Sequence, residues 1–190
     1  MEKPLDRRVQ KTRALLYETL LDLMVEKGYE AITVQDLIDR ANIGRSTFYS
    51  HFEDKEKLLT ACIEQLFTFL QSQTSAPSEA SDDPVRFRFS LAMFQHVQGH
   101  KLVYKAVVGK QSGLLVMYHM ERMLRRVISE ELNGLIERGA LKKLPDGVLA
   151  AHILGSFWTL LHWWMEQKTP YSAFEMDRMF HATVLDGIRS

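Results

Sequence analysis

Residues 41–58 read ANIGRSTFYSHFEDKEKL and contain a short helix whose two sides differ in chemistry. At about 100° per residue, Phe48 and Phe52 fall on one side of a helix over residues 45–52. The other side and its flanks carry polar or amphipathic groups, namely Arg45, Ser46, Thr47, Tyr49, Ser50 and His51. Such groups donate hydrogen bonds to phosphates and to base edges. The stretch therefore predicts a helix held by two aromatic rings with a hydrogen-bonding outer face.

The segments around this stretch predict three more helices. Apolar residues recur at helical spacing over residues 9–27, and Gly28 follows where such a helix would end. Thr33 stands three residues before Asp36, which is the pattern of a capping box at the start of a second helix. Asp54 is placed to cap a fourth helix. A short helix, a turn and a second short helix, supported by a longer preceding one, indicate a helix-turn-helix motif.

Residues 71–84, QSQTSAPSEASDDP, contain no large apolar side chain and predict a loop. Beyond it, helical patterns return between Gly and Pro breaks, over residues 87–97, 102–108, 114–138, 146–167 and 172–189. No alternation typical of strands is present. The sequence therefore predicts an all-α protein of nine helices in two domains. Residues 1–54 form a three-helix helix-turn-helix domain, and residues 55–190 form a helical bundle for ligand binding and dimerisation.

The composition limits the class of protein. The 190 residues include 24 basic and 24 acidic side chains, so net charge alone indicates no nucleic acid or membrane partner. Cys62 is the single cysteine, which excludes an internal disulfide and zinc sites built from several cysteines. The apolar run at 149–165 is shorter than the roughly 20 residues of a membrane span and includes polar residues. The N-terminus lacks the apolar core of a signal peptide, so we expect a cytoplasmic protein without a membrane partner.

The sequence STFYSHF at 46–52, followed by DK at 54–55, resembles the DNA-binding segment of the TetR family of bacterial transcriptional regulators. The family's hallmark is a small residue, Thr, an aromatic residue, Tyr, any residue, His and Phe, followed by an N-cap and Lys. The resemblance covers residues 9–60. It implies a sequence-specific regulator that binds a palindromic double-stranded DNA operator as a homodimer, acting as a repressor that responds to a small-molecule effector.

The resemblance also implies roles for single residues. It assigns phosphate contacts to Thr33, Tyr49, His51 and Lys55. It assigns base contacts to Gln35, Arg45, Ser46 and Thr47, and Ser50 lies on the same polar face. Arg45 stands at the start of the helix, where residues reach deepest into a major groove. Gly44 departs from the Ser or Thr that the family often has there, so a phosphate contact is lost.

In the family, the C-terminal helices form a ligand pocket and a dimer interface. The last two predicted helices are more apolar than one small core requires, and we expect them to meet a second subunit. The expected interface residues are Phe157, Leu161, Trp164, Met176 and Phe180. The expected pocket residues are Cys62, Phe69, Phe94, Tyr104, Met117 and Tyr118. Met and aromatic residues at helical spacing also form ordinary cores, so a solid body that serves only dimerisation stays open.

Two alternatives share the DNA-binding head. The ending of the chain resembles a C-terminal domain of regulators some of which, including activators of dihydroxyacetone kinase operons, work through a partner protein. The second alternative is an architectural DNA-binding protein without an inducer. No metal, cofactor or enzymatic activity is expected, and Cys62 falls on the apolar side of its helix.

Overall fold

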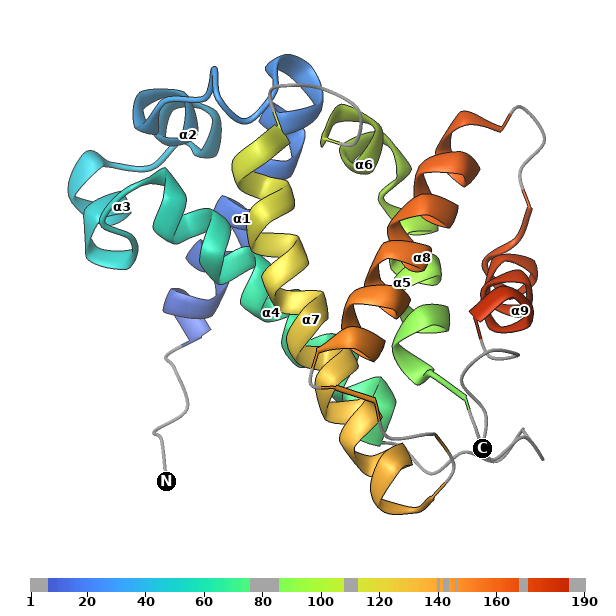
Figure 1. Cartoon of the computed structure of the whole chain (residues 1–190). Helices are drawn as coiled ribbons and strands as arrows, with labels where there is room; N and C mark the ends of the chain where they lie inside the picture. Colours follow the sequence, from blue (N-terminus) through green and yellow to red (C-terminus); the bar gives the residue numbers. More distant parts are fainter. Residues whose placement is uncertain are drawn as a thin grey trace. The chain divides into compact units, whose positions relative to one another are not determined.

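The computed structural model describes residues 7–75, 86–107, 113–139, 141, 144–145, 147–167 and 171–184. Within these ranges the chain forms nine helices and no strand (Figure 1). They are α1 (Arg7–Lys27), α2 (Val34–Ala41), α3 (Arg45–His51), α4 (Lys55–Ser75), α5 (Arg88–Gly99), α6 (Lys101–Val107), α7 (Leu114–Glu137), α8 (Val148–Glu166) and α9 (Ala173–Val184). The predicted all-α fold is confirmed. The predicted loop over residues 71–84 begins later than expected, because α4 continues to Ser75, and its remainder lies outside the described residues.

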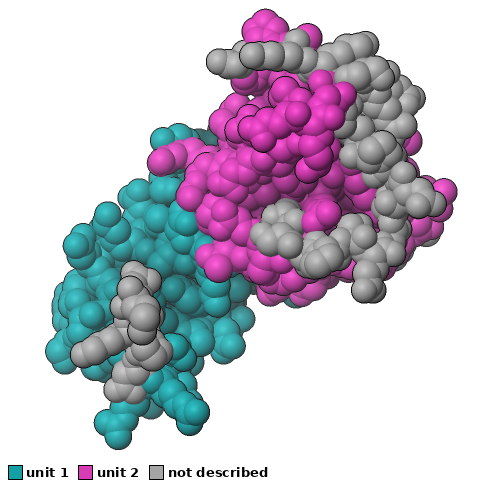
Figure 2. Space-filling view, turned by 90° about the horizontal axis from the view of Figure 1, so that it is seen from below, with its two compact units in different colours: residues 1–65, 102–119 teal, residues 66–101, 120–190 magenta. Residues whose placement is uncertain are grey.

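The chain divides into two compact units, coloured in Figure 2. Unit 1 comprises Met1–Gln65 and Leu102–His119, and unit 2 comprises Leu66–Lys101 and Met120–Ser190. The expected domain boundary after residue 54 therefore falls inside unit 1. The first turns of α4, all of α6 except Lys101, and the start of α7 belong with the helix-turn-helix segment. Buried residues of α4 such as Leu58 extend its core.

Local chemistry explains where the helices of the head begin and end. Gly28 follows α1 with a φ of 79°, which glycine adopts without steric cost. At the start of α2, the Asp36 N–H donates to Thr33 Oγ1 at 3.2 Å, and the Thr33 N–H donates to Asp36 Oδ2 at 2.7 Å. This is the predicted capping box. After α2, Asn42 takes the left-handed conformation with a φ of 49° and turns the chain toward α3.

Two ion pairs attach α2 to α1. Lys27 Nζ lies 2.7 Å from Asp36 Oδ1, and the Arg40 guanidinium forms a two-pronged pair with Glu26 at 2.8 and 2.7 Å. The Lys27 contact, together with the bonds from Thr33, holds the pKa of Asp36 well below its usual range. The capping box and the ion pairs thus fix the helix that precedes the turn.

The core of unit 2 is aromatic. Six rings form it, those of Phe87, Phe89, Phe94, Phe157, Trp164 and Phe180. The ring centroids of Phe94 and Phe157 are 5.0 Å apart, and the Phe180 ring meets Phe157 edge-on at 6.0 Å. Through these rings α5 packs on α9, and α9 packs on α8. The tilted and edge-on arrangements are those that aromatic quadrupoles favour.

This core corrects the predicted dimer contacts. Five residues were expected to face a second subunit, Phe157, Leu161, Trp164, Met176 and Phe180, and each is at most 2% exposed within one chain. Their side chains are already covered by helices of the same unit, so no surface is left for a partner. Other apolar residues of the same region are exposed instead, namely Trp163 (39%), Tyr171 (39%) and Phe174 (60%).

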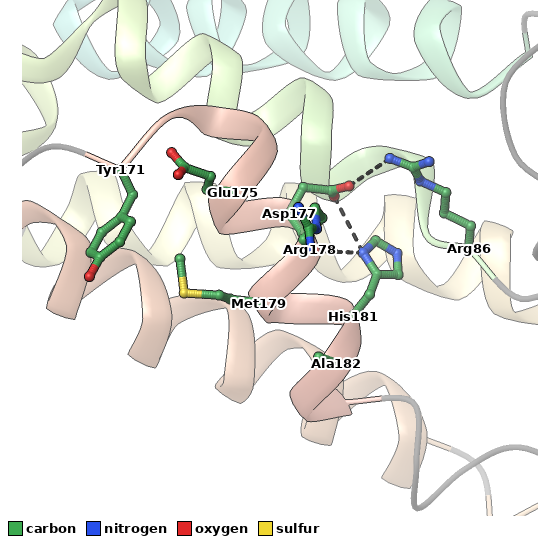
Figure 3. Close-up of a pocket in the computed structure, with 8 residues that line it drawn as sticks. All are labelled: Arg86, Tyr171, Glu175, Asp177, Arg178, Met179, His181 and Ala182. Carbon is green, nitrogen blue, oxygen red and sulfur yellow. Dashed lines mark hydrogen bonds and ion pairs between the residues drawn. The ribbon is translucent and has the colours of Figure 1, made fainter.

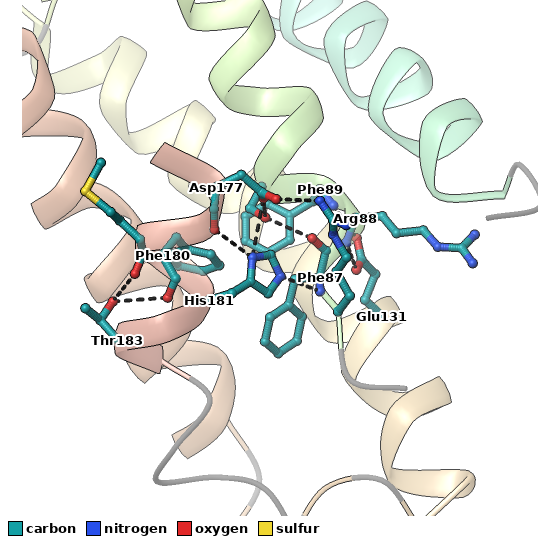
Figure 4. A network of polar contacts seen from close by, with 11 residues as sticks. Phe87, Arg88, Phe89, Glu131, Asp177, Phe180, His181 and Thr183 are labelled. Carbon is teal, nitrogen blue, oxygen red and sulfur yellow. Dashed lines mark hydrogen bonds and ion pairs between the residues drawn. The ribbon is translucent and has the colours of Figure 1, made fainter. Parts of the chain in front are cut away.

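The start of α5 is capped by side chains from two other helices (Figure 4). Phe87 occupies the N-cap position and offers no side-chain bond. The Glu131 carboxylate of α7 accepts the N–H groups of Arg88 and Phe89 at 2.7 and 2.8 Å, and Nε2 of His181 accepts the Phe87 N–H at 3.0 Å. Three amides that a helix start leaves unpaired are thereby satisfied through tertiary contacts.

Asp177 of α9 completes the network (Figure 4). Its buried carboxylate accepts hydrogen bonds from Arg86 at 2.8 Å and from the Ser90 hydroxyl at 2.5 Å. Since Nε2 of His181 is an acceptor, Nδ1 carries the hydrogen and donates to the Asp177 carbonyl at 2.8 Å. The network joins α5, α7 and α9 at the place where α5 begins.

The stability of unit 2 is expected to depend on pH through Glu131. Burial raises the pKa of its carboxyl from 4.5 to about 7 and outweighs the two backbone hydrogen bonds, which lower it. A raised carboxyl pKa means that the charged form is disfavoured in the fold, so stability falls as pH rises from 4.5 to 7. The loss is roughly 3 kcal/mol. In denaturant unfolding, Glu131→Gln should lose this dependence, while Glu130→Gln, an exposed neighbour, should keep it. Parallel pH profiles for wild type and Glu131→Gln would contradict the assignment.

Candidate DNA-binding surface

Two aromatic residues fix the orientation of α3. Phe48 is fully buried, and Phe52, at the end of the helix, is also buried. The Phe48 ring meets Tyr49 edge-on at 5.5 Å, while Arg13 of α1 places its guanidinium carbon 4.8 Å from the centre of the Phe52 ring. With this side of α3 held in the core of unit 1, the opposite side must face outward.

The outward side of α3 carries the predicted donors. Arg45, Ser46, Tyr49 and Ser50 are exposed, and Thr47 and His51 are half-buried. The Arg45 guanidinium carbon lies 5.8 Å from the centre of the Tyr49 ring, a cation–π contact that orients the longest side chain of the helix. One seven-residue helix thus presents a guanidinium, a phenol, an imidazole and three hydroxyls.

Three of the predicted contacts already have partners within the chain. The Thr33 hydroxyl donates to Asp36 Oδ2 at 2.6 Å, so it has no hydrogen left for a phosphate. The Ser50 hydroxyl donates to the Thr47 carbonyl at 2.7 Å and can act toward DNA only as an acceptor. Gln35 donates one amide hydrogen to the Asp39 carboxylate at 2.7 Å and keeps the other.

Lys55, for which a phosphate contact is predicted, makes several contacts within the chain. Its ammonium donates to three backbone carbonyls after α1, those of Tyr29, Glu30 and Ile32, at 3.2, 3.1 and 2.7 Å. It also lies 4.7 Å from the centre of the Tyr29 ring. In this arrangement all three ammonium hydrogens are donated within the chain, so the phosphate contact stays a prediction. Lys55 joins the first turn of α4 to the segment between α1 and α2.

Lys55→Met is therefore expected to reduce stability rather than the salt dependence of DNA binding. Loss of three hydrogen bonds from a half-buried ammonium should lower the free energy of unfolding by about 1–2 kcal/mol. The slope of log Kd against log salt should stay unchanged, whereas a lost phosphate contact would reduce it by about 0.9. Lys57→Met, on the exposed side of the same turn, is the control for stability. A smaller salt slope with normal stability would support the predicted phosphate contact.

The predicted effector residues do not form one group. Cys62, Tyr104, Met117 and Tyr118 belong to unit 1, while Phe69 and Phe94 belong to unit 2. Phe94 lies inside the aromatic core of unit 2, and Phe69 and Tyr118 are exposed. Cys62 and Tyr104 interact within unit 1, and burial raises the pKa of the Cys62 thiol to about 11. A thiol with this pKa is a poor nucleophile at neutral pH.

A pocket of about 530 Å³ lies elsewhere, on unit 2 (Figure 3). It is lined by Arg86 and by residues on or beside α9, including Tyr171, Arg178 and Met179. None of the six predicted effector residues lines it. Of these six side chains, Phe94 and Tyr104 are buried in the cores of their units, and the others are half-buried or exposed away from this cavity.

A histidine pair lies at the end of α5. His96 and His100 are four residues apart, and their rings stack with centroids 4.3 Å apart. Burial, followed by the charge of His100, lowers the pKa of His96 to about 4. The described residues contain no group of three His, Cys, Asp or Glu side chains that could hold a metal ion. Among them, no helix is long and apolar enough to cross a membrane.

Comparison with known families matches both parts of the chain. Residues 16–62 match the model described as bacterial regulatory proteins, tetR family. Residues 87–186 match the model described as transcriptional regulator C-terminal region, which is a C-terminal model of TetR-type regulators. The two matches cover the helix-turn-helix segment and most of the residues beyond α4.

Three individual proteins illustrate the similarity. YxbF of Bacillus subtilis, an HTH-type transcriptional regulator, is 45% identical over 65 residues, which are 34% of this chain and 17% of that protein's length. The HTH-type transcriptional repressor KstR2 of Mycobacterium tuberculosis is 22% identical over 190 residues, 95% of this chain and 94% of KstR2. The crystal structure of a TetR-family regulator from Syntrophomonas wolfei aligns with a TM-score of 0.75 at 23% identity, over 92% of this chain and 93% of that one.

Proposed function

Since the chain belongs to the TetR family of bacterial transcriptional regulators, we propose that it is a ligand-responsive repressor that binds a palindromic DNA operator as a homodimer. The observation that carries this proposal is the outward side of α3, where Arg45 and Tyr49 stand exposed above the buried Phe48. Repression is proposed because KstR2, which aligns over nearly the whole chain, is named a repressor.

We place the homodimer contact on the exposed apolar residues of α8, α9 and the segment between them. The rings of Trp163 and Tyr171 stack with centroids 5.6 Å apart, and Trp164 Nε1 donates to the Tyr171 carbonyl at 3.0 Å. Phe174 lies one turn further along the chain and is largely exposed. Exposed aromatic residues held in fixed positions are typical of subunit contacts. One α3 reads too few base pairs for a unique site, so two heads on one duplex are needed.

We propose that a small molecule releases the operator, and that Cys62, Tyr104 and Met117 of unit 1 contact it. These three side chains are half-buried or buried, and they come from α4, α6 and α7. Since α4 starts at Lys55, which joins it to the head, a ligand against this group could change how α3 is presented. The site of action would be the cytoplasm, where the DNA of a bacterium lies.

Selection of binding sites from a random duplex pool tests the proposal. The expected product is one inverted repeat whose half-site centres are about 34 Å or somewhat more apart. Light scattering should give the mass of a dimer. The selected site should lie at a few promoters, and deleting the gene should raise their transcription. Recovery of an asymmetric site, or many dispersed sites without transcriptional effect, would contradict a dimeric repressor.

A further inference from the structure

Two buried side-chain atoms in the described part of the chain lack a hydrogen-bond partner, Tyr29 Oη and His119 Nε2. Both belong to unit 1, which contains the DNA-binding helices. Native proteins pair nearly all buried polar groups, so an unpaired one points to a second state or a functional role. One carboxylate lies near His119 Nε2, and the charge of the same carboxylate acts on Tyr29.

That carboxylate is Glu56. Its Oε1 lies 3.5 Å from His119 Nε2, too far for a good hydrogen bond with a neutral imidazole but close enough for an ion pair. Glu56 is also the strongest of the charges that, after burial, raise the pKa of Tyr29 to about 12. The His119 side chain is 13% exposed and Glu56 is 56% exposed. The imidazole is therefore held in place, while the carboxylate can move toward it.

The location of Glu56 links its contact with His119 to the helix-turn-helix segment. Glu56 is in the first turn of α4, directly after Lys55. The Lys55 ammonium donates hydrogen bonds to three carbonyls of the segment between α1 and α2. The ion pairs of α2 with α1 continue this connection toward the turn that precedes α3. His119 stands on α7. A stronger bond between His119 and Glu56 would therefore restrain the first turn of α4 and, through it, the helix-turn-helix segment.

We propose that His119 is a positioning residue for DNA binding, whose protonated imidazole holds Glu56 and thereby the DNA-binding head. The proposal rests on the proposed binding of an operator by α3. Neutral His119 leaves the contact at its long distance, and gain of a proton at Nε2 turns it into an ion pair. Operator affinity should then rise as the pH falls through the titration of this histidine.

The other charges around the pair decide its strength. The charges of Glu56, Asp54 and Glu30 all act on the neighbouring Tyr29, so the carboxylates near the first turn of α4 are acidic neighbours of this site. Lys55 is directed to backbone carbonyls, and the Tyr118 ring beside His119 is neutral and edge-on at 5.5 Å. Exposure of Glu56 to solvent screens the attraction, so an effect of roughly three- to fivefold on Kd is expected.

The experiment measures operator affinity at pH 6.0 and 8.5, at constant ionic strength, for wild type, His119→Gln, Glu56→Gln and the double variant. The ratio of Kd between His119→Gln and wild type should be near one at pH 8.5 and about three to five at pH 6.0. In the Glu56→Gln background, His119→Gln should change nothing at either pH. His51→Gln is the control, because His51 lies on α3 and its effect should not depend on Glu56.

A second readout separates this proposal from the proposed function. NMR of the DNA-free protein follows the His119 imidazole, and Glu56→Gln should lower its titration midpoint. An unchanged midpoint, or a pH-independent Kd ratio with normal operator binding, would overturn the role of His119 and leave the repressor standing. Failure of wild type to bind any selected operator would overturn the repressor itself. If circular dichroism shows that His119→Gln does not fold, the operator Kd at both pH values and the NMR titration are measured on Glu56→Gln, whose changed residue is on the surface.

Discussion

Replacing Phe157 with alanine is expected to lower the free energy of unfolding by about 3–5 kcal/mol. The ring is fully buried and lies between Phe89, Phe94 and Phe180, at centroid distances of 5.6, 5.0 and 6.0 Å. Its removal leaves a cavity lined by three rigid rings that cannot collapse into it. Denaturant unfolding at two protein concentrations measures the loss and shows whether it depends on association.

Phe174→Ala is the matched control, since it removes the same ring from an exposed position of α9. We expect it to change the stability of the subunit by less than about 1 kcal/mol and to weaken dimerisation in light scattering. The original interface prediction requires the reverse. A Phe157→Ala variant that keeps wild-type stability but becomes monomeric would show that the ring faces a second subunit.

The two variants illustrate why the core could not be separated from the interface in the sequence. Trp163 and Trp164 are adjacent, yet Trp163 is 39% exposed and Trp164 is buried with its indole N–H bonded to the Tyr171 carbonyl. An apolar stripe indicates only that a helix side avoids water, whether against its own chain or against another. Apolar side chains of α9 pack on α5 and α8, and the rings of Phe157 and Trp164 on α8 meet Phe89 and Phe94 of α5.

The head was predictable because its determinants are local. The box of Thr33 and Asp36 and the burial of Phe48 and Phe52 follow from spacing alone, and the structure confirms them. The contacts of Lys55 within the chain were not predicted, because its side chain reaches carbonyls more than 20 residues earlier, after α1. Sequence spacing cannot reveal such contacts. The family resemblance singled out Lys55 as a functional residue, and the structure adds the carbonyls that it contacts.

The role of Glu131 also depends on contacts between residues far apart in the chain. Nothing in its sequence neighbourhood indicates burial, since it lies in a polar run on α7. Its role appears only where α5 begins with Phe87, a residue that cannot cap a helix by itself. The missing cap at α5 and the half-buried carboxylate on α7 explain each other only in three dimensions.

Arg45→Ala is expected to weaken operator binding by about 1–3 kcal/mol at each half-site, so roughly 30-fold to 10⁴-fold for a dimer on both. Arg45 is the first residue of α3, it is exposed, and its guanidinium rests on the Tyr49 ring. Site selection with the variant should lose preference at one base position of each half-site. Tyr49→Phe should instead weaken all sequences alike, because it removes a hydroxyl and keeps the ring beneath the guanidinium.

Arg45→Lys separates reading of a base from neutralisation of a phosphate. Lysine keeps the positive charge but lacks the planar fork that can bond two acceptors of one base at once. If Arg45 reads a base edge, the lysine variant should recover part of the affinity and little of the sequence preference. Full recovery of both would identify a phosphate contact, and an unchanged consensus in Arg45→Ala would remove the residue from the reading surface. Specificity would then rest on Ser46 and Thr47, the next two residues of α3.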